Sequence, residues 1–214
     1  PPPGVDLGFE SDWLRRVWYG FIAVLLAAGA VALYVRLTQG LTSTNLTSIV
    51  PWGAWVAFYI YFVGLSSGAF LVSTLDTVFG VPGLDRISRD ALFVSLVSMA
   101  VALLFIWVDL GRMDRMFFPF IWRQFSSALS WEIHAYVLYM GVIGSSLYFS
   151  MRADLARLAA HSSGLRERIY TLLTLRRDET TAAAEQVDRR WLKRIGIAGI
   201  PLSLFFVVGG EGVL

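Results

Sequence analysis

Long runs of apolar residues, interrupted by short charged segments, form the main pattern of the sequence. Residues 51–75 contain no charged side chain, and at about 1.5 Å of rise per residue a helix of this length exceeds the ~30 Å hydrocarbon layer of a bilayer. Four further apolar runs follow the same pattern: 17–35, 91–108, 131–151 and 195–214. The pattern predicts an all-α fold, a polytopic membrane helix bundle with about five spans in this sequence.

The segments outside these runs divide the chain further. Residues 1–16 are rich in Pro and Gly and then polar, which indicates a lead-in to the first span. Residues 152–194 carry charges of both signs and predict a water-exposed, largely helical connection, with a partner interface as the alternative. The connection 109–130 is too aromatic for an ordinary loop, so we expect it in the membrane interface or over a pocket mouth. The chain opens without Met and stops inside an apolar run, so we expect a fragment.

Composition agrees with an integral membrane protein and excludes several function classes. Apolar residues make up 56% of the chain and charged residues only 16%. Because Cys is absent, this chain can hold no iron–sulfur cluster, thiolate metal site, covalent haem or disulfide. The basic residues lie between the apolar runs and not along an aromatic groove, so no nucleic-acid partner is expected.

The distribution of Lys and Arg predicts the orientation in the bilayer. Fourteen lie in the segments on the side of the N-terminus and four in the segments on the other side. By the positive-inside rule, the N-terminus and residues 152–194 are therefore expected in the cytoplasm of a prokaryote, with the chain in its cytoplasmic (inner) membrane. The start of the 51–75 run and the DLGRMDR segment then face outward.

The 51–75 run has two unusual features. Gly64, Ser67 and Gly68 form a stripe of small residues, which predicts that another helix approaches closely there. Tyr59 and Tyr61 carry hydroxyl groups that need a partner inside hydrocarbon, which indicates a polar pocket or a neighbouring helix.

Several motifs resemble one known family. The PWG start, the aromatic run and the GLSSG stripe of 51–75, DLGRMDR from Asp109 and the helix opening at Trp131 resemble the NrfD/PsrC family, the membrane subunits of quinone-linked redox complexes. The resemblance covers 51–151 well. Members generally contain two four-helix bundles, sometimes with a helix in front. It therefore implies that 17–35 is the extra helix, that 51–151 supplies three helices of the first bundle and that 195–214 begins the fourth.

Ionisable and phenolic side chains are expected at one depth, in the outer half of the spans. Antiparallel spans carry them at opposite sequence ends: Tyr59, Asp109, Glu132, His134 and Glu211. Such groups are costly in a membrane and mark a functional site by default.

Each of these groups also has a purely structural interpretation. Asp109 can pair with Arg112 three residues later, and Glu132 can be a helix N-terminal residue capped by Ser130. His134 can be a packing residue, while the helix of Glu211 is too short to judge. The shared depth favours a shared function.

A quinone head fits such a site better than a haem. A membrane b-type haem needs two axial His from facing helices, and only His134 lies in a predicted span. A quinone needs donors for its carbonyl oxygens and a route for protons. The predicted quinone-binding residues are Trp52, Tyr59, Asp109, Arg112 and His134, and the predicted proton-transfer residues are Asp109, Glu132, His134 and Glu211. No catalytic residue or metal ligand is predicted in this chain alone.

The resemblance implies the same cofactor and adds partners. It implies a menaquinone or ubiquinone site near the face where a ferredoxin-like four-cluster iron–sulfur subunit docks, with electrons passing to a catalytic subunit, often molybdopterin-dependent. Tyr59 matches the family position that contacts the quinone head, and Asp109 and Arg112 match the D-x-G-R element. Glu132 and His134 depart from the family pattern.

Two other functions stay open. An ion-translocating subunit requires polar groups in the cytoplasmic halves of the spans, where the sequence offers the hydroxyls of Thr74, Ser95 and Ser98 but no carboxylate. A multi-span transporter predicts broken helices at the midplane, for which only Pro201 is available.

Overall fold

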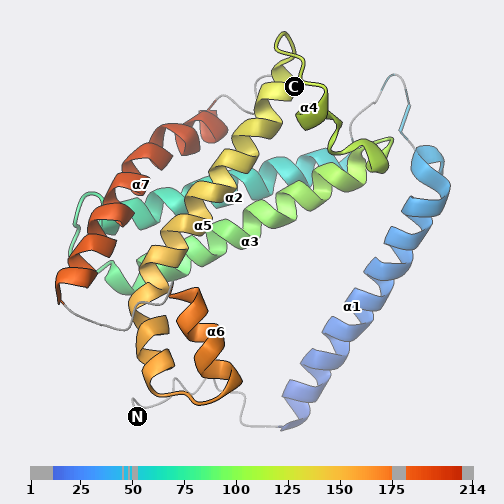
Figure 1. The fold of residues 1–214 in the computed structure, drawn as a ribbon. Helices are drawn as coiled ribbons and strands as arrows, with labels where there is room; N and C mark the ends of the chain where they lie inside the picture. The colour runs from blue at the N-terminus through green and yellow to red at the C-terminus, as the bar shows by residue number, and fades with distance from the viewer. Residues whose placement is uncertain (1–11, 45, 48, 50–52, 175–181, 209–214) are drawn as a thin grey trace.

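The computed structural model describes residues 12–208 except 45, 48, 50–52 and 175–181, and all regular structure in this part is helical (Figure 1). Trp52 and Glu211, two predicted site residues, lie outside the described residues. The helices are α1 (Asp12–Gln39), α2 (Ala54–Thr77), α3 (Asp85–Asp109), α4 (Phe118–Ile121), α5 (Ala128–Ala160), α6 (Leu165–Leu173) and α7 (Ala182–Val208), with short 3₁₀ turns η1 (Gly40–Ser43) and η2 (Met113–Arg115).

Four helices, α2, α3, α5 and α7, pack into one bundle with a common core (Figure 1). Successive helices of the bundle run in opposite directions. The start of α2, the end of α3, the start of α5 and the end of α7 therefore lie at one end of the bundle. The core consists of large apolar and tyrosine side chains from all four helices: Tyr59, Val63, Phe70, Leu92, Met99, Ala102, Tyr136, Tyr139, Ile143 and Phe206. The predicted all-α bundle is confirmed.

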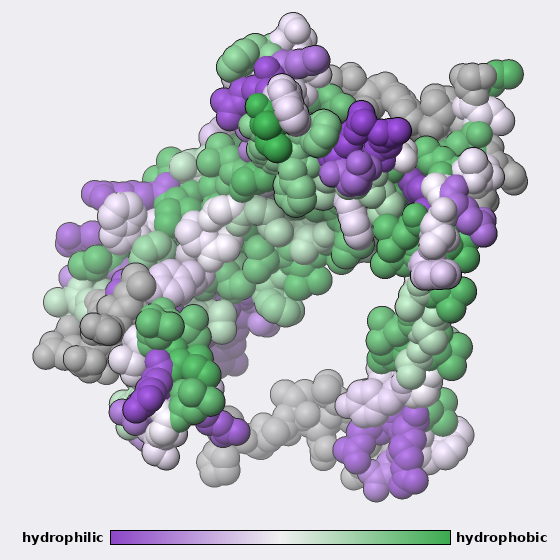
Figure 2. All heavy atoms as spheres, turned by 45° about the vertical axis from the view of Figure 1, so that its right-hand side comes forward, coloured by the Kyte–Doolittle hydropathy of each residue, from purple (hydrophilic) through white to green (hydrophobic). Residues whose placement is uncertain are grey.

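Helix α1 stands apart from this bundle (Figure 1). Nearly all of its apolar side chains are exposed, and in Figure 2 they form a continuous apolar column. The buried residue of α1 is a charged one, Arg36 near its C-terminus. Its Nε donates to the Val108 carbonyl at 2.8 Å and its NH2 group to the Leu110 carbonyl at 2.7 Å, so a single arginine ties α1 to the end of α3.

Four helices of the described chain are long and apolar enough to cross a membrane: α1 with its following turn, α2, α3 and α7. About five spans were predicted. The remaining predicted span, 131–151, lies within α5, a 33-residue helix of the bundle. Helix α5 is long enough to cross a membrane but is less apolar than the other four helices. Its Glu132, His134, tyrosines and serines account for this difference.

The closest approach that a glycine permits in the described structure lies on α7, at Gly199. A Cβ atom added to Gly199 would lie 2.7 Å from Phe70 Cε1 and 2.7 Å from Val142 Cγ1. Gly68 is exposed, and a Cβ atom there would meet no atom of the described structure within 4 Å, so the predicted close approach at Gly68 is not made by any described helix. Ser67 does face α7, where its carbonyl accepts a 3.0 Å hydrogen bond from Ser203, but Gly68 lies about 100° further around the helix.

Hydroxyl pairs join α2 to α3 inside the bundle. Ser66 and Ser95 lie 3.2 Å apart, Ser73 and Ser88 lie 3.1 Å apart, and all four are buried. We call the end of the bundle that contains the start of α2, the end of α3 and the start of α5 the tyrosine end, because it contains Tyr59. The opposite end is called the arginine end, because it contains Arg89.

Beyond the bundle at the arginine end, the predicted charged connection 152–194 is made, in its described part, of the end of α5, the short α6 and the start of α7. Helix α6 packs against α5.

Candidate functional site at the tyrosine end of the bundle

A buried carboxyl group and two tyrosines form the centre of the tyrosine end. Glu132 and Tyr136 lie one turn apart on α5 and therefore point to the same side. The Tyr136 hydroxyl donates a 2.6 Å hydrogen bond to Glu132 Oε1. Tyr59 of α2 is buried and lies within hydrogen-bonding range of Tyr136. Two helices on opposite sides of the bundle, α2 and α5, thus bring together one carboxyl and two phenol groups, which we call the Glu132 cluster.

The start of α5 explains why Glu132 points inward. Ser127 is the N-cap residue, and its side chain accepts a 3.4 Å hydrogen bond from the Ser130 backbone N–H. The alternative in which Ser130 caps the helix and Glu132 only balances the helix dipole is therefore wrong. Glu132 lies beyond the first turn, faces the core and is 6% exposed. A carboxyl group at this depth requires a hydrogen-bond donor, which Tyr136 provides.

Aromatic rings close the cluster on the side of α7. The Tyr136 ring stacks on Phe206 with centroids 4.8 Å apart, and Tyr139 contacts the same ring at 5.2 Å. Tyr139 is fully buried, and its hydroxyl has no partner in the described part of the chain. A donor of this kind in an aromatic wall is available to an acceptor such as a carbonyl oxygen.

His134 points away from the Glu132 cluster. It follows Glu132 by two positions, about 200° around the helix, so the two side chains lie on different sides of α5. Its Nδ1 lies 2.6 Å from the Ser130 carbonyl oxygen and its ring 4.9 Å from the ring of Phe120. Since a carbonyl cannot donate, Nδ1 carries the proton, and Nε2 of the neutral ring is an acceptor. Nε2 is buried without a partner among the described residues.

A cavity of about 50 Å³ lies beside His134, lined by Arg123, Gln124, Ser130 and Trp131. Pockets for small molecules typically measure about 300–1,000 Å³. The cavity therefore has room for water but not for a quinone ring.

The arginine beside Asp109, at the end of α3, is Arg36 of α1 and not Arg112. Arg112 is exposed and makes no ion pair with Asp109 in the described structure, so the predicted pairing is wrong. The connection after Asp109 leaves the helix, and this removes the three-residue helical spacing. The positive charge that acts on Asp109 is Arg36, which binds the carbonyl groups of the two flanking residues. Asp109 Oδ1 is buried without a partner in the described part.

The structure thus gives three groups at one end of the bundle: the Glu132 cluster in the core, His134 beneath α4, and Asp109 beside Arg36. Sequence reasoning identified Tyr59, Glu132 and His134 but missed Tyr136 and Arg36. The four-residue spacing between Glu132 and Tyr136 is a signal that could have found the first. No local pattern relates Arg36 to the carbonyl groups more than 70 positions later. Among the described residues no group of His, Asp or Glu side chains could hold a metal ion.

Comparison with known proteins identifies the family. The chain is 37% identical over 94% of its length to a selenate reductase subunit of Mesobacillus selenatarsenatis, covering 48% of that protein. It is 32% identical over 67% of its length to a putative dimethyl sulfoxide reductase membrane subunit of Halobacterium salinarum, covering 33% of it. It is 28% identical over 61% of its length to the Hdr-like menaquinol oxidoreductase integral membrane subunit of Archaeoglobus fulgidus, covering 33% of it.

The chain spans about half or less of the length of these curated relatives. The family model described as polysulphide reductase, NrfD, matches residues 42–203, which include the Glu132 cluster, Asp109 and His134. The resemblance inferred from the sequence is thereby confirmed, and the chain belongs to the NrfD family.

Proposed function

We propose that the protein is an integral membrane subunit of a respiratory oxidoreductase complex that binds quinone or quinol at the tyrosine end and exchanges electrons with an iron–sulfur partner subunit. The observation that carries this proposal is the buried, hydrogen-bonded Glu132 cluster within a membrane bundle. The names of the relatives, which include a menaquinol oxidoreductase membrane subunit, support the same class of cofactor.

The residues present fit a quinone head. Bound quinone would supply a couple of two electrons and two protons. The buried Tyr139 hydroxyl, unpartnered in the described structure, is a donor for a carbonyl oxygen. Tyr59 holds a second hydroxyl in the same core, on the opposite helix. Glu132 Oε1 accepts a hydrogen bond from the Tyr136 hydroxyl. A carboxyl group in this place can take a proton from a quinol or give one to a quinone.

His134 and Asp109 are assigned to proton exchange between this core and the tyrosine-end surface. The small cavity beside His134 has room for water but not for a quinone ring, so we assign His134 to proton transfer and not to the wall of the quinone pocket. Burial of Asp109 opposes its charged form, and the adjacent positive charge of Arg36 favours that form. Arg112, which is exposed, and Trp52 and Glu211, which lie outside the described residues, stay predictions from the sequence.

The remaining parts of the complex are proposed from the family. A ferredoxin-like four-cluster iron–sulfur subunit would dock at the tyrosine end, and a molybdopterin-type or other catalytic subunit would act on the terminal substrate. Because the sequence contains no cysteine, we assign the iron–sulfur clusters to that partner. We place the N-terminus in the cytoplasm of a prokaryote, as the Lys and Arg distribution predicts.

The test is quinol-dependent turnover of the purified complex carrying Glu132→Gln. We expect the quinol-dependent rate to fall at least tenfold, since general acid–base groups typically contribute about 10²–10⁴-fold. The rate with an artificial dye that passes electrons directly to the partner subunits should stay unchanged. Equal quinol-dependent rates in both proteins would exclude Glu132 from the quinone reaction.

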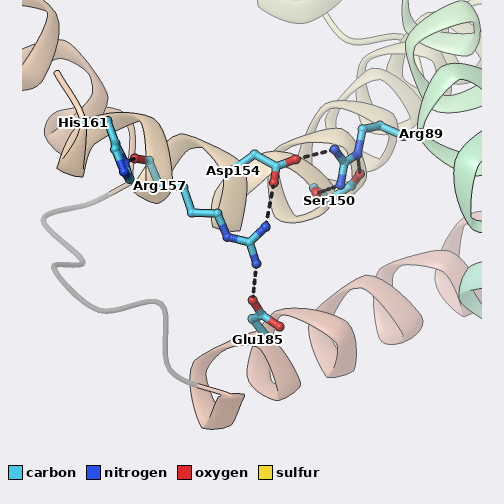
Figure 3. A network of polar contacts seen from close by, with 6 residues as sticks. All are labelled: Arg89, Ser150, Asp154, Arg157, His161 and Glu185. Carbon is cyan, nitrogen blue, oxygen red and sulfur yellow. Dashed lines mark hydrogen bonds and ion pairs between the residues drawn. The ribbon is translucent and has the colours of Figure 1, made fainter. Parts of the chain in front are cut away.

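A second function, proton translocation, is favoured by a specific observation at the arginine end. A cavity of about 500 Å³ lies between the ends of all four bundle helices, and it is lined by carboxyl groups that lie outside the uncharged runs of the sequence. The acidic lining residues are Asp76, Asp85, Asp154, Glu185 and Asp188. Figure 3 shows part of its wall, where Arg89 of α3 pairs with Asp154 of α5 and Arg157 of α5 pairs with Glu185 of α7.

Buried hydroxyl groups lie between this cavity and the Glu132 cluster. Ser67, Ser146 and Tyr139 each have a buried oxygen with no partner in the described structure, which is the usual sign of an internal water site. Quinol oxidation by the complex in sealed vesicles would show whether charge crosses the membrane, using a dye that senses membrane potential. A transporter with broken spans is not favoured, because α7 continues as a helix through Pro201.

A further inference from the structure

One side of α7 carries three cations that have no acidic partner. Arg190, Lys193 and Arg194 are exposed, and none of them makes an ion pair within the described part of the chain. The acidic residues of the same helix segment point elsewhere. Glu185 pairs with Arg157 at 3.0 Å and Asp188 with Arg152 at 3.2 Å, both across to α5. This segregation leaves a purely basic side on α7.

The basic side lies where the helix enters its apolar segment. The uncharged run of α7 begins at Ile195, directly after the three cations, so a bilayer around this run places them among the headgroups. Trp191 is 47% exposed, and the Arg194 guanidinium lies 5.5 Å from the centroid of its ring. An exposed tryptophan at this position is typical of a membrane interface.

The same side of the helix continues into exposed apolar residues. At 100° per residue, Arg190, Ile197 and Leu204 lie in one line along α7, with Lys193 and Arg194 on its two sides. Ile197 is 52% and Leu204 45% exposed. The opposite side, with Gly196, Gly199 and Phe206, is buried in the bundle. The exposed strip therefore combines a cationic head with an apolar tail of the same helix.

We propose that this strip, Arg190, Lys193, Arg194, Ile197 and Leu204, binds an anionic phospholipid. The phosphate group contacts the three cations, and the acyl chains lie along Ile197 and Leu204. Charge complementarity favours an anionic head, because neither acidic residue of the described helix α7, Glu185 or Asp188, lies on this side. Continuity of the cations with the exposed apolar residues favours a lipid over an acidic protein surface, since only a lipid matches both parts with one molecule.

The first test compares two lipids that differ only in charge. The purified complex is titrated with phosphatidylglycerol or phosphatidylcholine of identical acyl chains, and bound lipid is counted by native mass spectrometry. In the double variant R190Q/R194Q, the preference for phosphatidylglycerol over phosphatidylcholine should be about 25-fold lower than in the wild type, since each cation near a membrane surface contributes about fivefold. The matched control is R166Q/R168Q, which removes two exposed cations from α6. Equal binding of both lipids by the wild type, or equal losses in the two double variants, would overturn the proposal.

The second test uses Lys193, the single lysine of the sequence. Its amine is labelled with an acylating reagent in nanodiscs of either lipid, and the modified peptide is measured by mass spectrometry. Labelling should be slower in phosphatidylglycerol, because a bound phosphate shields the amine. Protection that persists in phosphatidylcholine and in delipidated complex would instead indicate a protein subunit on this strip. This test needs no substitution, so it decides the matter even where a variant fails to assemble.

Discussion

Tyr136 donates a 2.6 Å hydrogen bond to Glu132 one helical turn earlier, and both side chains are buried in the bundle core. A carboxyl group at membrane depth is costly, and a donor on the same helix provides its partner without help from a neighbouring subunit. Both members of the pair belong to α5, whereas Tyr59 comes from α2 on the opposite side of the bundle, so the complete cluster requires the assembled bundle.

Tyr59→Phe should weaken quinol-dependent turnover while leaving the complex assembled. The substitution removes one hydroxyl from the Glu132 cluster and keeps the ring that packs in the core. Loss of a buried hydrogen-bonding group costs about 1–3 kcal/mol, which corresponds to a rate lower by about 5- to 150-fold. The measurement compares quinol-dependent turnover with dye-dependent turnover.

Tyr61→Phe is the matched control, because this tyrosine is 62% exposed and lies two residues away on another side of α2. Its turnover should equal that of the wild type. A similar loss in both variants would indicate a general effect on α2 and would remove Tyr59 from the quinone site.

Gly199→Leu should prevent normal assembly of the bundle. A side chain at this position would collide with Phe70 and Val142, which lie in the packed interior. Forcing extra atoms into a packed core typically costs about 1–3 kcal/mol. We expect a lower yield of assembled complex and a lower midpoint of thermal unfolding in detergent.

Gly68→Leu serves as the comparison and reverses the expectation from the GLSSG stripe. Gly68 is exposed, with no described atom near its added Cβ, so this variant should assemble as the wild type does. If Gly68→Leu disrupted assembly and Gly199→Leu did not, the packing of α2 against α7 described above would be wrong.

The helices could be predicted because apolar runs of spanning length are a local pattern. The positions of Tyr59, Glu132 and His134 along these runs also place all three at one end of the bundle, as the structure has them. Which side of a helix meets its neighbour is a different question. His134 follows Glu132 by only two positions, yet Glu132 joins the core and His134 lies beside Phe120 of α4. Depth alone grouped them, and only packing separates them.

Contacts between distant segments could not be predicted from the sequence either. The GLSSG stripe of α2 and the glycines of α7 both contain small residues at close spacing, and only the bundle reveals that Gly199 is the one pressed against Phe70. Similarly, Arg36 and Arg112 are both arginines near the ends of predicted spans. The direction of the chain after Asp109 decides which of them lies beside it.

Arg36→Gln should loosen the attachment of α1 to the bundle. The guanidinium satisfies the carbonyl groups of Val108 and Leu110, and hydrogen bonds to charged groups contribute about 1.5–3 kcal/mol. We expect faster proteolysis between α1 and α2 and a lower midpoint of thermal unfolding. Arg15→Gln is the control, since its 2.6 Å pair with Asp12 is exposed. Equal proteolysis of Arg36→Gln and wild type would show that α1 is held by something other than this arginine.

Asp188→Asn should destabilise the arginine end far more than the exposed change Asp12→Asn. Asp188 pairs with Arg152 at 3.2 Å, and both side chains are largely buried, at 8% and 16% exposure. Removing one partner leaves the Arg152 charge without its carboxylate in a place of low dielectric, and breaking a buried pair typically costs about 3–5 kcal/mol. The Asp12 pair with Arg15 is solvent-exposed, where such pairs contribute about 0–1 kcal/mol at most. Denaturant unfolding of the two variants, followed by fluorescence, measures the difference.

Because the Glu132 cluster lies at the other end of the bundle, Asp188→Asn should leave the quinol-dependent rate of the folded fraction unchanged. A selective loss of that rate at wild-type stability would instead connect Asp188 to the reaction and favour a proton path through the arginine-end cavity.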